Sequence, residues 1–254
     1  MNENHHTGRD YLIDAVVLAA GKGTRMKSDL PKVLHLIAGR PLLDHVLDTV
    51  EAVGIDHTVV VVGHQADLVE TTCRREGMDF VLQEPQLGTG HAVQVTVDNL
   101  RTGGYCVVLA GDVPLLRAET LKRLIDGTVS SGAAGVVLTC LVEDAGAYGR
   151  IVKDPDGRIQ KIVEARDASE VELAIGEYNT GVFCFKTDLM IEALDNLTTD
   201  NQQGEYYLTD TVAYLVGAGY PVEAVATNDP DEVVGINTVD ELGKAEQLLA
   251  RRGE

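Results

Sequence analysis

The first 140 residues alternate between continuous apolar runs and segments with helical periodicity. The apolar runs are IDAVVLAA, HTVVVVG, FVLQ, CVVLAGD and, just beyond, GVVLTCLV. Such runs are typical of strands buried on both faces of a parallel sheet. Between them, the spacing of apolar residues predicts helices over 41–53, 65–76, 89–100 and 117–130. We therefore expect right-handed strand–helix–strand crossovers and a layered α/β fold.

The pattern changes from about residue 148. YGRIVKDPDGRIQKIVEA predicts a β-hairpin with an Asp-Pro-Asp-Gly turn. A strand in EYNTGVFCFKT, a helix in DLMIEALDNL beginning at Asp188, and a helix in YYLTDTVAYLVGAG follow, and then the strands VEAVA and EVVGI. Thr238 and Glu241 have capping-box spacing, which predicts a helix over 238–254. The apolar stripe of this helix comprises Val239, Leu242, Ala245 and Leu249.

Composition and charge narrow the class of protein. The 254 residues are 44% hydrophobic, enough to bury the core of one large domain, and residues 1–10 are expected to form a polar, disordered tail without a secretory signal. The net charge of −19 disfavours binding to nucleic acid or to an anionic membrane. No apolar run approaches the roughly 20 residues of a membrane span. The 4 cysteines include no CxxC pair, so we expect buried free thiols and a cytoplasmic location.

The stretch LAAGKGTRMKSDLPK follows the first apolar run and has the composition of a phosphate-binding loop. It lacks the Walker A order, and Met26 stands where a dinucleotide fingerprint needs its third glycine. Gly21 and Gly23 are expected to allow positive φ and to point backbone N–H groups at a phosphate. Arg25 and Lys32 would add positive charge. A glycine-rich turn with solvated basic residues is the alternative. We favour phosphate binding because this acidic chain places four basic side chains within eleven positions here.

Two polar residues follow later apolar runs. Asp112 ends CVVLAGD, and Asn237 follows EVVGI. Their oxygens suit Mg²⁺, which takes few protein ligands when phosphates and water complete its shell. Each residue is also compatible with simple capping of the next turn or helix. Because ligands bind beyond the carboxyl ends of parallel strands, we expect Gly21, Gln83 and Asp112 to converge at one edge of the sheet.

The stretch LQEPQLGTGHAV places Gln83 at a strand end and Gly88 and Thr89 at a helix start. A glutamine amide can read a base edge, and small residues at a helix N-terminus let a nucleotide approach. A plain turn capped by Thr89 is the alternative. We interpret His91 as a packed histidine rather than a catalytic base.

Three residues on or beside the strands of the second half have side chains or backbone groups suited to sugar hydroxyls. They are Gly149, Glu164 and Asn179. Glu164 is equally compatible with a surface position on the hairpin.

Together these stretches resemble the sugar-1-phosphate nucleotidyltransferases. The specific resemblance is to the uridylyltransferase half of the bacterial bifunctional N-acetylglucosamine-1-phosphate uridylyltransferase/glucosamine-1-phosphate acetyltransferase family. It rests on LAAGKGTRMKSDLPKVLH, QLGTGHAV, GDVPLL, YGRIV, IVEARDA, EYNTGVF, GEYYLTD and GINT, which occur in the family's order over about residues 13–240. The resemblance implies a Rossmann-like three-layer α/β/α fold with a mixed, mainly parallel sheet and an inserted β-rich sugar-binding region. The implied nucleotidyltransferase domain spans residues 11–237, with a nucleotide-binding part at 11–147 and a mainly sugar-binding part at 148–237, before the C-terminal helix.

The resemblance also implies roles for individual residues. Arg25, Lys32 and Asp112 would be catalytic, with Arg25 binding the departing pyrophosphate. Asp112 and Asn237 would bind Mg²⁺. The sugar would be contacted by Gly149, Glu164, Asn179 and Asn237. The nucleotide would be held by Leu18, Ala19, Ala20, Gly21, Lys32, Gln83, Gly88 and Thr89.

The implied reaction transfers UMP from UTP to N-acetyl-α-D-glucosamine 1-phosphate. It yields UDP-N-acetylglucosamine and pyrophosphate for cell-envelope precursor synthesis. A sugar phosphate is mostly dianionic near neutral pH, given a second pKa of about 6, so it needs no general base. The alternatives are thymidylyl or cytidylyl transfer to another sugar phosphate, a dinucleotide-dependent oxidoreductase, and a non-catalytic nucleotide-sugar sensor.

The sequence departs from the family in two respects. Ala110 stands where many members have a tyrosine, so a contact near the acetamido group is expected to be missing or replaced. No hexapeptide repeat of the family's acetyltransferase β-helix appears before Glu254. Because the family's trimer contacts involve that β-helix, we expect a monomer.

Overall fold

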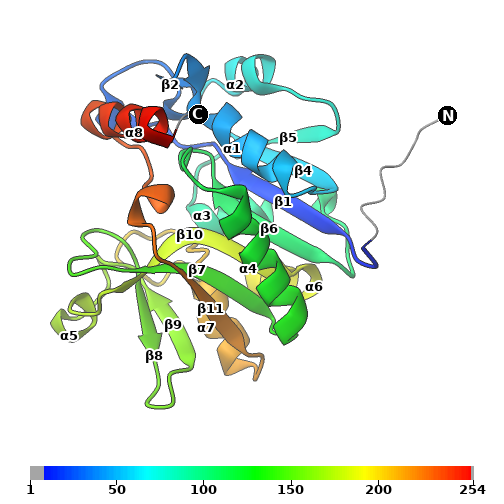
Figure 1. The fold of residues 1–254 in the computed structure, drawn as a ribbon. Coiled ribbons are helices and arrows are strands. Elements are labelled where there is room, and N and C mark those ends of the chain that lie inside the picture. The colour runs from blue at the N-terminus through cyan, green and yellow to red at the C-terminus, as the bar shows by residue number, and fades with distance from the viewer. Residues whose placement is uncertain (1–8, 253–254) are drawn as a thin grey trace.

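One sheet organises the part of the chain that the computed structural model describes, residues 9–252. Within these residues nine strands form the sheet, in the order β11-β7-β10-β6-β1-β4-β5, with the β8–β9 hairpin attached to β10 (Figure 1). Strand β10 is antiparallel to β6 and β7, whereas β1, β4, β5 and β6 are mutually parallel neighbours. This confirms the predicted mixed, mainly parallel sheet. The main path contains β1 (Ile13–Leu18), β4 (His57–Val62), β5 (Met78–Leu82), β6 (Tyr105–Ala110), β7 (Gly135–Leu141), β10 (Glu177–Lys186) and β11 (Val222–Thr227).

Helices cover both faces of the sheet, so the predicted three-layer arrangement is confirmed (Figure 1). The helices predicted in the first half are present, but the segment 89–100 divides into a short α-helix and a 3₁₀-helix at Val97–Asn99. The helix expected from Asp188 begins one residue earlier. One face carries α1 (Leu42–Ala52), α2 (Ala66–Cys73) and α4 (Ala118–Ser131), and the other carries α3 (Thr89–Gln94), α6 (Thr187–Asp195) and α7 (Asp210–Gly217).

The alternation of side chains along the buried strands produces two cores. In β1, Ile13, Ala15 and Val17 pack on the side of α1, α2 and α4, and Val16 packs on the side of α3, α6 and α7. Covering both faces removes the usual apolar–polar alternation, which is why the run IDAVVLAA is almost entirely apolar. The sequence pattern therefore reported burial on both faces correctly.

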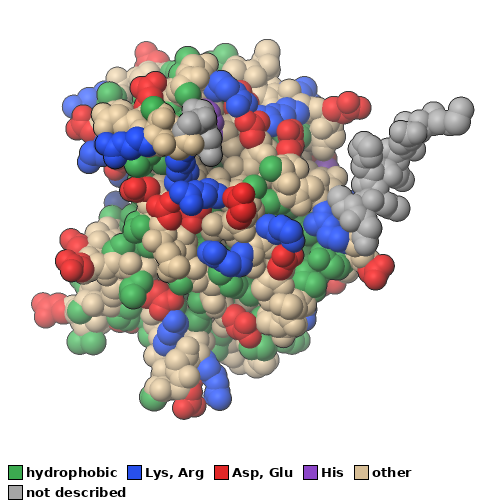
Figure 2. Space-filling view, in the orientation of Figure 1, with side chains coloured by type: hydrophobic (Ala, Val, Ile, Leu, Met, Phe, Trp, Pro, Cys, Tyr) green, Lys and Arg blue, Asp and Glu red, His purple; other side chains and the backbone are tan. Residues whose placement is uncertain are grey.

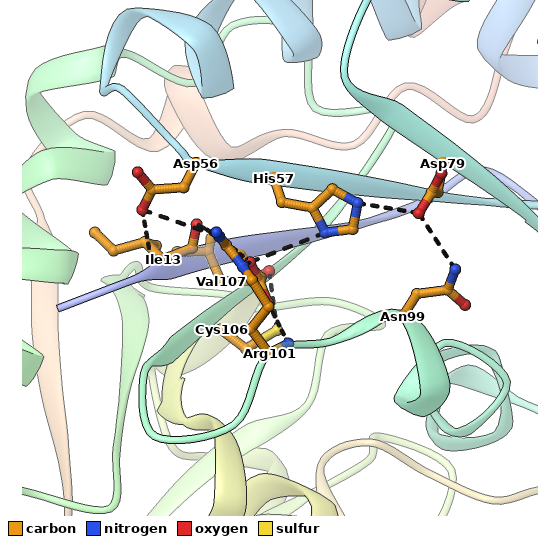
Figure 3. Close-up of polar contacts among 9 residues, drawn as sticks. Ile13, Asp56, His57, Asp79, Asn99, Arg101, Cys106 and Val107 are labelled. Carbon is orange, nitrogen blue, oxygen red and sulfur yellow. Dashed lines mark hydrogen bonds and ion pairs between the residues drawn. The ribbon is translucent and has the colours of Figure 1, made fainter. Parts of the chain in front are cut away.

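Asp14 is the polar exception in β1 and is only 1% exposed. Its carboxylate accepts hydrogen bonds from the backbone N and the Nε of Arg101, both at 2.7 Å, and from the Nη2 of the same guanidinium. His57 lies between this ion pair and Asp79, whose Oδ2 is 3.1 Å from His57 Nε2 (Figure 3). These contacts join the loop before β6 to β1, β4 and β5 at the amino ends of the strands.

The second half contains the predicted hairpin, formed by β8 (Arg150–Lys153) and β9 (Ile159–Val163). In its turn, Asp154 Oδ1 accepts backbone N–H groups from Asp156 at 3.0 Å and Arg158 at 2.9 Å. The short helix α5 (Glu170–Leu173) follows the hairpin. A separate two-stranded sheet, β2 (Leu36–Ile37) and β3 (Arg40–Pro41), lies before α1.

The strand predicted in EVVGI was wrong. Pro230–Val233 forms a 3₁₀-helix, which Asp229 begins by accepting the Asp231 N–H at 3.1 Å. The apolar residues of this segment are buried without joining the sheet: Val233 packs in the core beside α1 and α4, and Ile236 packs beneath α8 (Val239–Arg252). The capping box of α8 is confirmed by reciprocal hydrogen bonds between Thr238 and Glu241 of 2.9 and 3.2 Å.

All four cysteines are buried and free, as predicted. The predicted tail at residues 1–10 lies outside the described residues except for Arg9 and Asp10, and the Arg9 guanidinium donates to the Gly54 carbonyl. In this part of the chain no helix has the length and apolarity to cross a membrane. Acidic and basic side chains are interspersed on the face that carries α4 and α8 (Figure 2).

Candidate active site

A cleft of about 370 Å³ opens beyond the carboxyl ends of β1, β5 and β6. Its wall is formed largely by the loops that follow these strands, which is where an α/β sheet of this kind binds ligands. The convergence predicted for Gly21, Gln83 and Asp112 is therefore observed. All eight residues predicted to hold the nucleotide line this cleft, namely Leu18, Ala19, Ala20, Gly21, Lys32, Gln83, Gly88 and Thr89.

The loop after β1 folds back on itself so that its basic residues approach the cleft. Gly23 has φ 62°, and a Cβ added there would lie 2.6 Å from Lys32 Cβ. A side chain at this position would push Lys32 away, so Gly23 is needed for close approach as well as for its backbone conformation. Of the two glycines expected to allow positive φ, Gly23 adopts it and Gly21 does not.

Lys32 joins the two residues predicted to bind a metal. Its Nζ forms an ion pair with Asp112 Oδ2 and lies 3.1 Å from Asn237 Oδ1. The same Asn237 oxygen accepts a hydrogen bond of 2.8 Å from Arg25 Nη2. These four residues, called the polar cluster below, come from the loop after β1, the end of β6 and the segment before α8. The side chains of Lys32 and Asp112 are 17% and 12% exposed, so their attraction is only partly screened by water.

A second set of contacts shapes the other wall of the cleft. Gln83 is buried, and its Nε2 donates to the Gly88 carbonyl at 2.9 Å and lies 3.2 Å from His91 Nδ1. Thr89 Oγ1 accepts the backbone N–H of Leu208 at 3.1 Å. Gly88 has φ 110°, and a Cβ there would lie 2.5 Å from the Tyr206 carbonyl oxygen. The loop that contains Gly88, called the glycine loop, is therefore held against the segment before α7. His91 packs beside Gln83 as predicted.

Three of the four predicted sugar-binding residues also meet. The Gly149 carbonyl accepts the Asn179 N–H at 2.8 Å, and a Cβ added to Gly149 would lie 3.5 Å from Glu164 Cδ. The Glu164 carboxylate accepts a hydrogen bond of 2.9 Å from Thr209, which lies four residues after Glu205 of the nucleotide cleft. Asn237, also predicted to contact the sugar, lies instead with the polar cluster.

Glu164 is a partly buried carboxyl group with a shifted pKa. Burial raises its pKa above the ordinary value, the hydrogen bond from Thr209 opposes the rise, and the nearby carboxylates of Asp210 and Asp167 add to it. Burial raises the pKa of Asp210 as well. Glu164 therefore lies just after β9, partly buried and hydrogen-bonded to Thr209, rather than fully exposed on the hairpin.

The comparison that decides the family concerns most of the chain. A model of the MobA-like NTP transferase domain matches residues 15–213. The chain belongs to this family. The matched range contains the loop after β1, Gln83, the glycine loop and Asp112, and it ends inside α7.

The curated relatives that share this domain are longer than the present chain. The bifunctional protein GlmU of Lactococcus lactis subsp. lactis (strain IL1403) is 46% identical over 94% of this chain and 52% of the relative. The bifunctional protein GlmU of Clostridioides difficile (strain 630) is 43% identical over the same shares. The chain therefore spans about half the length of the curated relatives it matches. The similarity to bifunctional proteins confirms the resemblance inferred from the motifs.

Solved structures support the fold of the NTP transferase domain. A UDP-glucose pyrophosphorylase complexed with UDP-glucose has a TM-score of 0.77 at 16% identity, covering 95% of this chain and 99% of that one. HddC from Yersinia pseudotuberculosis, complexed with GMP-PN, has a TM-score of 0.65 at 20% identity, covering 94% and 99%. At these identities the likeness shows a shared fold.

The donor set beside the cleft fits a divalent cation. Asp112 Oδ2 and Asn237 Oδ1 both contact the Lys32 ammonium, so the two oxygens face one point. Oxygen atoms are the ligands that Mg²⁺ prefers. Among residues 9–252 no group of three or more His, Cys, Asp or Glu side chains could hold a metal, so phosphate and water would provide further ligands.

Some cleft residues of the NTP transferase domain were missed in the sequence. Gln86 and Glu205 line the cleft, and Gln86 Nε2 donates to the Ala20 carbonyl. Gln86 follows Gln83 in the same strand-end loop, so the strand-end rule that selected Gln83 could have included it. Glu205 lies in GEYYLTD, which contributed to the resemblance but received no role. Its position depends on the contact between residues 119 apart that joins Thr89 to Leu208.

Proposed function

We propose that the chain transfers UMP from UTP to N-acetyl-α-D-glucosamine 1-phosphate, giving UDP-N-acetylglucosamine and pyrophosphate for cell-envelope precursor synthesis. The observation that carries this proposal is that the cleft lined by the eight predicted nucleotide-binding residues opens onto Lys32 and Asp112 of the polar cluster. The relatives named bifunctional protein GlmU and the NTP transferase family support it.

The reaction needs two polyanions to be aligned more than it needs a base. An oxygen of the dianionic sugar phosphate forms a bond to the α-phosphorus, and the bond between that phosphorus and the oxygen bridging to the β-phosphate breaks. Backbone N–H groups of the loop after β1 would contact the triphosphate, and Lys32 and Arg25 would neutralise charge on the departing pyrophosphate. The Gly88 backbone and the Gln83 amide would position the base.

Residues 148–237 would mainly bind the sugar, as the sequence predicts. Glu164 and Asn179 lie beside the Gly149 backbone, which places a carboxyl group and an amide within one region. Both groups form directional hydrogen bonds to hydroxyl or amide groups. Asp112 and Asn237 would hold Mg²⁺, which would neutralise negative charge on the phosphates when bound.

The test is pyrophosphate release in the presence of Mg²⁺ from a panel of UTP, dTTP and CTP, each with N-acetylglucosamine 1-phosphate or glucose 1-phosphate. We expect the highest kcat/KM for UTP with N-acetylglucosamine 1-phosphate. A clear preference for another pair would support thymidylyl or cytidylyl transfer instead, and no turnover with any pair would favour a binding module. Asp112→Asn should reduce kcat by about 10²–10³, the size of effect found for lost electrostatic stabilisation. Asp126→Asn is the matched control, because Asp126 is exposed on α4.

A further inference from the structure

The two oxygens proposed to bind the metal are already held by cationic side chains. Asp112 Oδ2 is paired with Lys32, and Asn237 Oδ1 accepts hydrogen bonds from Lys32 at 3.1 Å and from Arg25 at 2.8 Å. One ammonium group therefore satisfies both oxygens at once. Because a Mg²⁺–oxygen distance is about 2.0–2.1 Å, Mg²⁺ and this ammonium cannot occupy the same point between the two oxygens.

The Asn237 side chain and the backbone of Asp112 are held in place by other contacts. Asn237 Nδ2 donates to the Gly235 carbonyl at 2.9 Å, and the Asn237 backbone N–H donates to Glu241 at 2.7 Å. The first contact orients the side-chain amide, so its oxygen faces the cations. The backbone carbonyl of Asp112 accepts the Ile236 N–H at 2.9 Å, which ties the end of β6 to the same segment. The Asn237 amide and the backbone that carries Asp112 thus keep their places without any metal.

Lys32 is the mobile partner. Its ammonium is carried on a four-carbon stem with several rotatable bonds. Lys32 and Asp112 both line the nucleotide cleft, so a rotation of the stem turns the ammonium away from Asp112 within the cleft without moving the backbone. Triphosphate oxygens in the cleft would accept the hydrogen bonds that the ammonium gives up.

From this geometry we infer that Lys32 occupies the metal site in the nucleotide-free protein and makes metal binding depend on the nucleotide. Without nucleotide, Mg²⁺ must displace the ammonium group that is paired with Asp112. With nucleotide, the phosphates receive the ammonium and release both oxygens. The coupling is reciprocal, so Mg²⁺ also increases the affinity for the nucleotide through the same exchange. The inference rests on the proposed function for the identity of the metal ligands.

The test measures metal binding in the absence of nucleotide, with Mg²⁺ as the probe in isothermal titration calorimetry. Lys32→Met keeps most of the side-chain length and removes the charge. We expect it to raise Mg²⁺ affinity by about ten-fold or more, the order that hydrogen bonds to charged groups contribute. Lys22→Met is the matched control, since Lys22 is an exposed lysine of the same loop, and removing it changes the net charge equally. Only a small rise is expected there.

An equal rise for Lys32→Met and Lys22→Met, or no rise for Lys32→Met, would overturn the inference. Lys32→Ala provides the same test with a second side chain, and far-UV circular dichroism checks that each variant is folded. A third comparison separates this inference from the proposed function. If Asp112→Asn leaves Mg²⁺ binding intact in the Lys32→Met background, the assignment of the metal ligands is wrong. If Asp112→Asn abolishes binding but Lys32→Met gives no gain, the metal site is right and the role of Lys32 is wrong.

Discussion

Replacing Arg101 tests how much its ion pair with the buried carboxylate of Asp14 contributes to the stability of the fold. In Arg101→Met, Asp14 Oδ1 loses two donors from the guanidinium, and the Ile13 carbonyl loses another at 3.2 Å. Asp14 Oδ2 keeps the backbone N–H of residue 101 at 2.7 Å. Breaking a buried pair typically costs about 3–5 kcal/mol. Because the Arg101 side chain is 35% exposed, we expect the lower end, about 3 kcal/mol.

The assay is unfolding by urea and by heat, each followed by far-UV circular dichroism, since the chain has no tryptophan. A loss of about 3 kcal/mol corresponds to a fall in Tm of about 6–12 °C for a domain of this size. Lys122→Met is the control: it removes an equal charge from a pair with Asp126 whose side chains are 64% and 55% exposed. That change should cost less than about 0.5 kcal/mol. If Arg101→Met costs no more than the control, the reasoning about Asp14 is refuted.

Three further predictions concern the cleft, pH and the thiols. Gly88→Ala places a Cβ 2.5 Å from the Tyr206 carbonyl oxygen, so it should cost about 1–3 kcal/mol and weaken UTP binding in calorimetry; Gly77→Ala, at φ 76° in open space, should leave UTP binding unchanged, and equal effects would contradict the argument. Burial raises the pKa of Glu164 in the folded state, so the folded protein retains this proton to higher pH than the unfolded chain, and wild-type stability relative to Glu164→Gln should fall as pH rises through that interval. In thermal unfolding, the Tm of Glu164→Gln relative to wild type should then be higher at about pH 8 than at about pH 5. A Tm difference that does not change with pH would count against this prediction. All four cysteines are buried, and burial raises the pKa of Cys184 to about 12, so a thiol reagent should label the native protein slowly and label four groups in denaturant; rapid labelling of the native protein would disprove this burial.

The layered fold was predictable because its signals are local. A strand covered on both faces must be apolar at nearly every position, and the runs at β1, β4 and β6 report this directly. The segment EVVGI shows the limit of the same signal. Val233 and Ile236 are buried, but in two different cores, and no neighbouring strand is available to pair with them. The Asp229-Pro230 pair, which begins the 3₁₀-helix, was the local signal that the apolar run obscured.

The candidate site was predictable in part for a different reason. Parallel strands bring their carboxyl ends to one edge, so Gln83 and Asp112 could be placed together without knowledge of any side-chain contact. The contacts of Lys32 with Asp112 and Asn237 join residues 80 and 205 apart and depend on how the loop after β1 and the segment before α8 pack. No local pattern encodes that packing. For the same reason Glu205 was not recognised as part of the cleft.

The central claim is that the chain joins a sugar phosphate to the α-phosphorus of UTP. The most direct measurement uses UTP labelled with ³²P at either the α or the γ position, incubated with N-acetylglucosamine 1-phosphate and Mg²⁺. The α label should appear in UDP-N-acetylglucosamine and the γ label in pyrophosphate, and both products should require the sugar phosphate. Transfer of the γ label to the sugar, or release of the α label as UMP without a sugar nucleotide, would contradict the account.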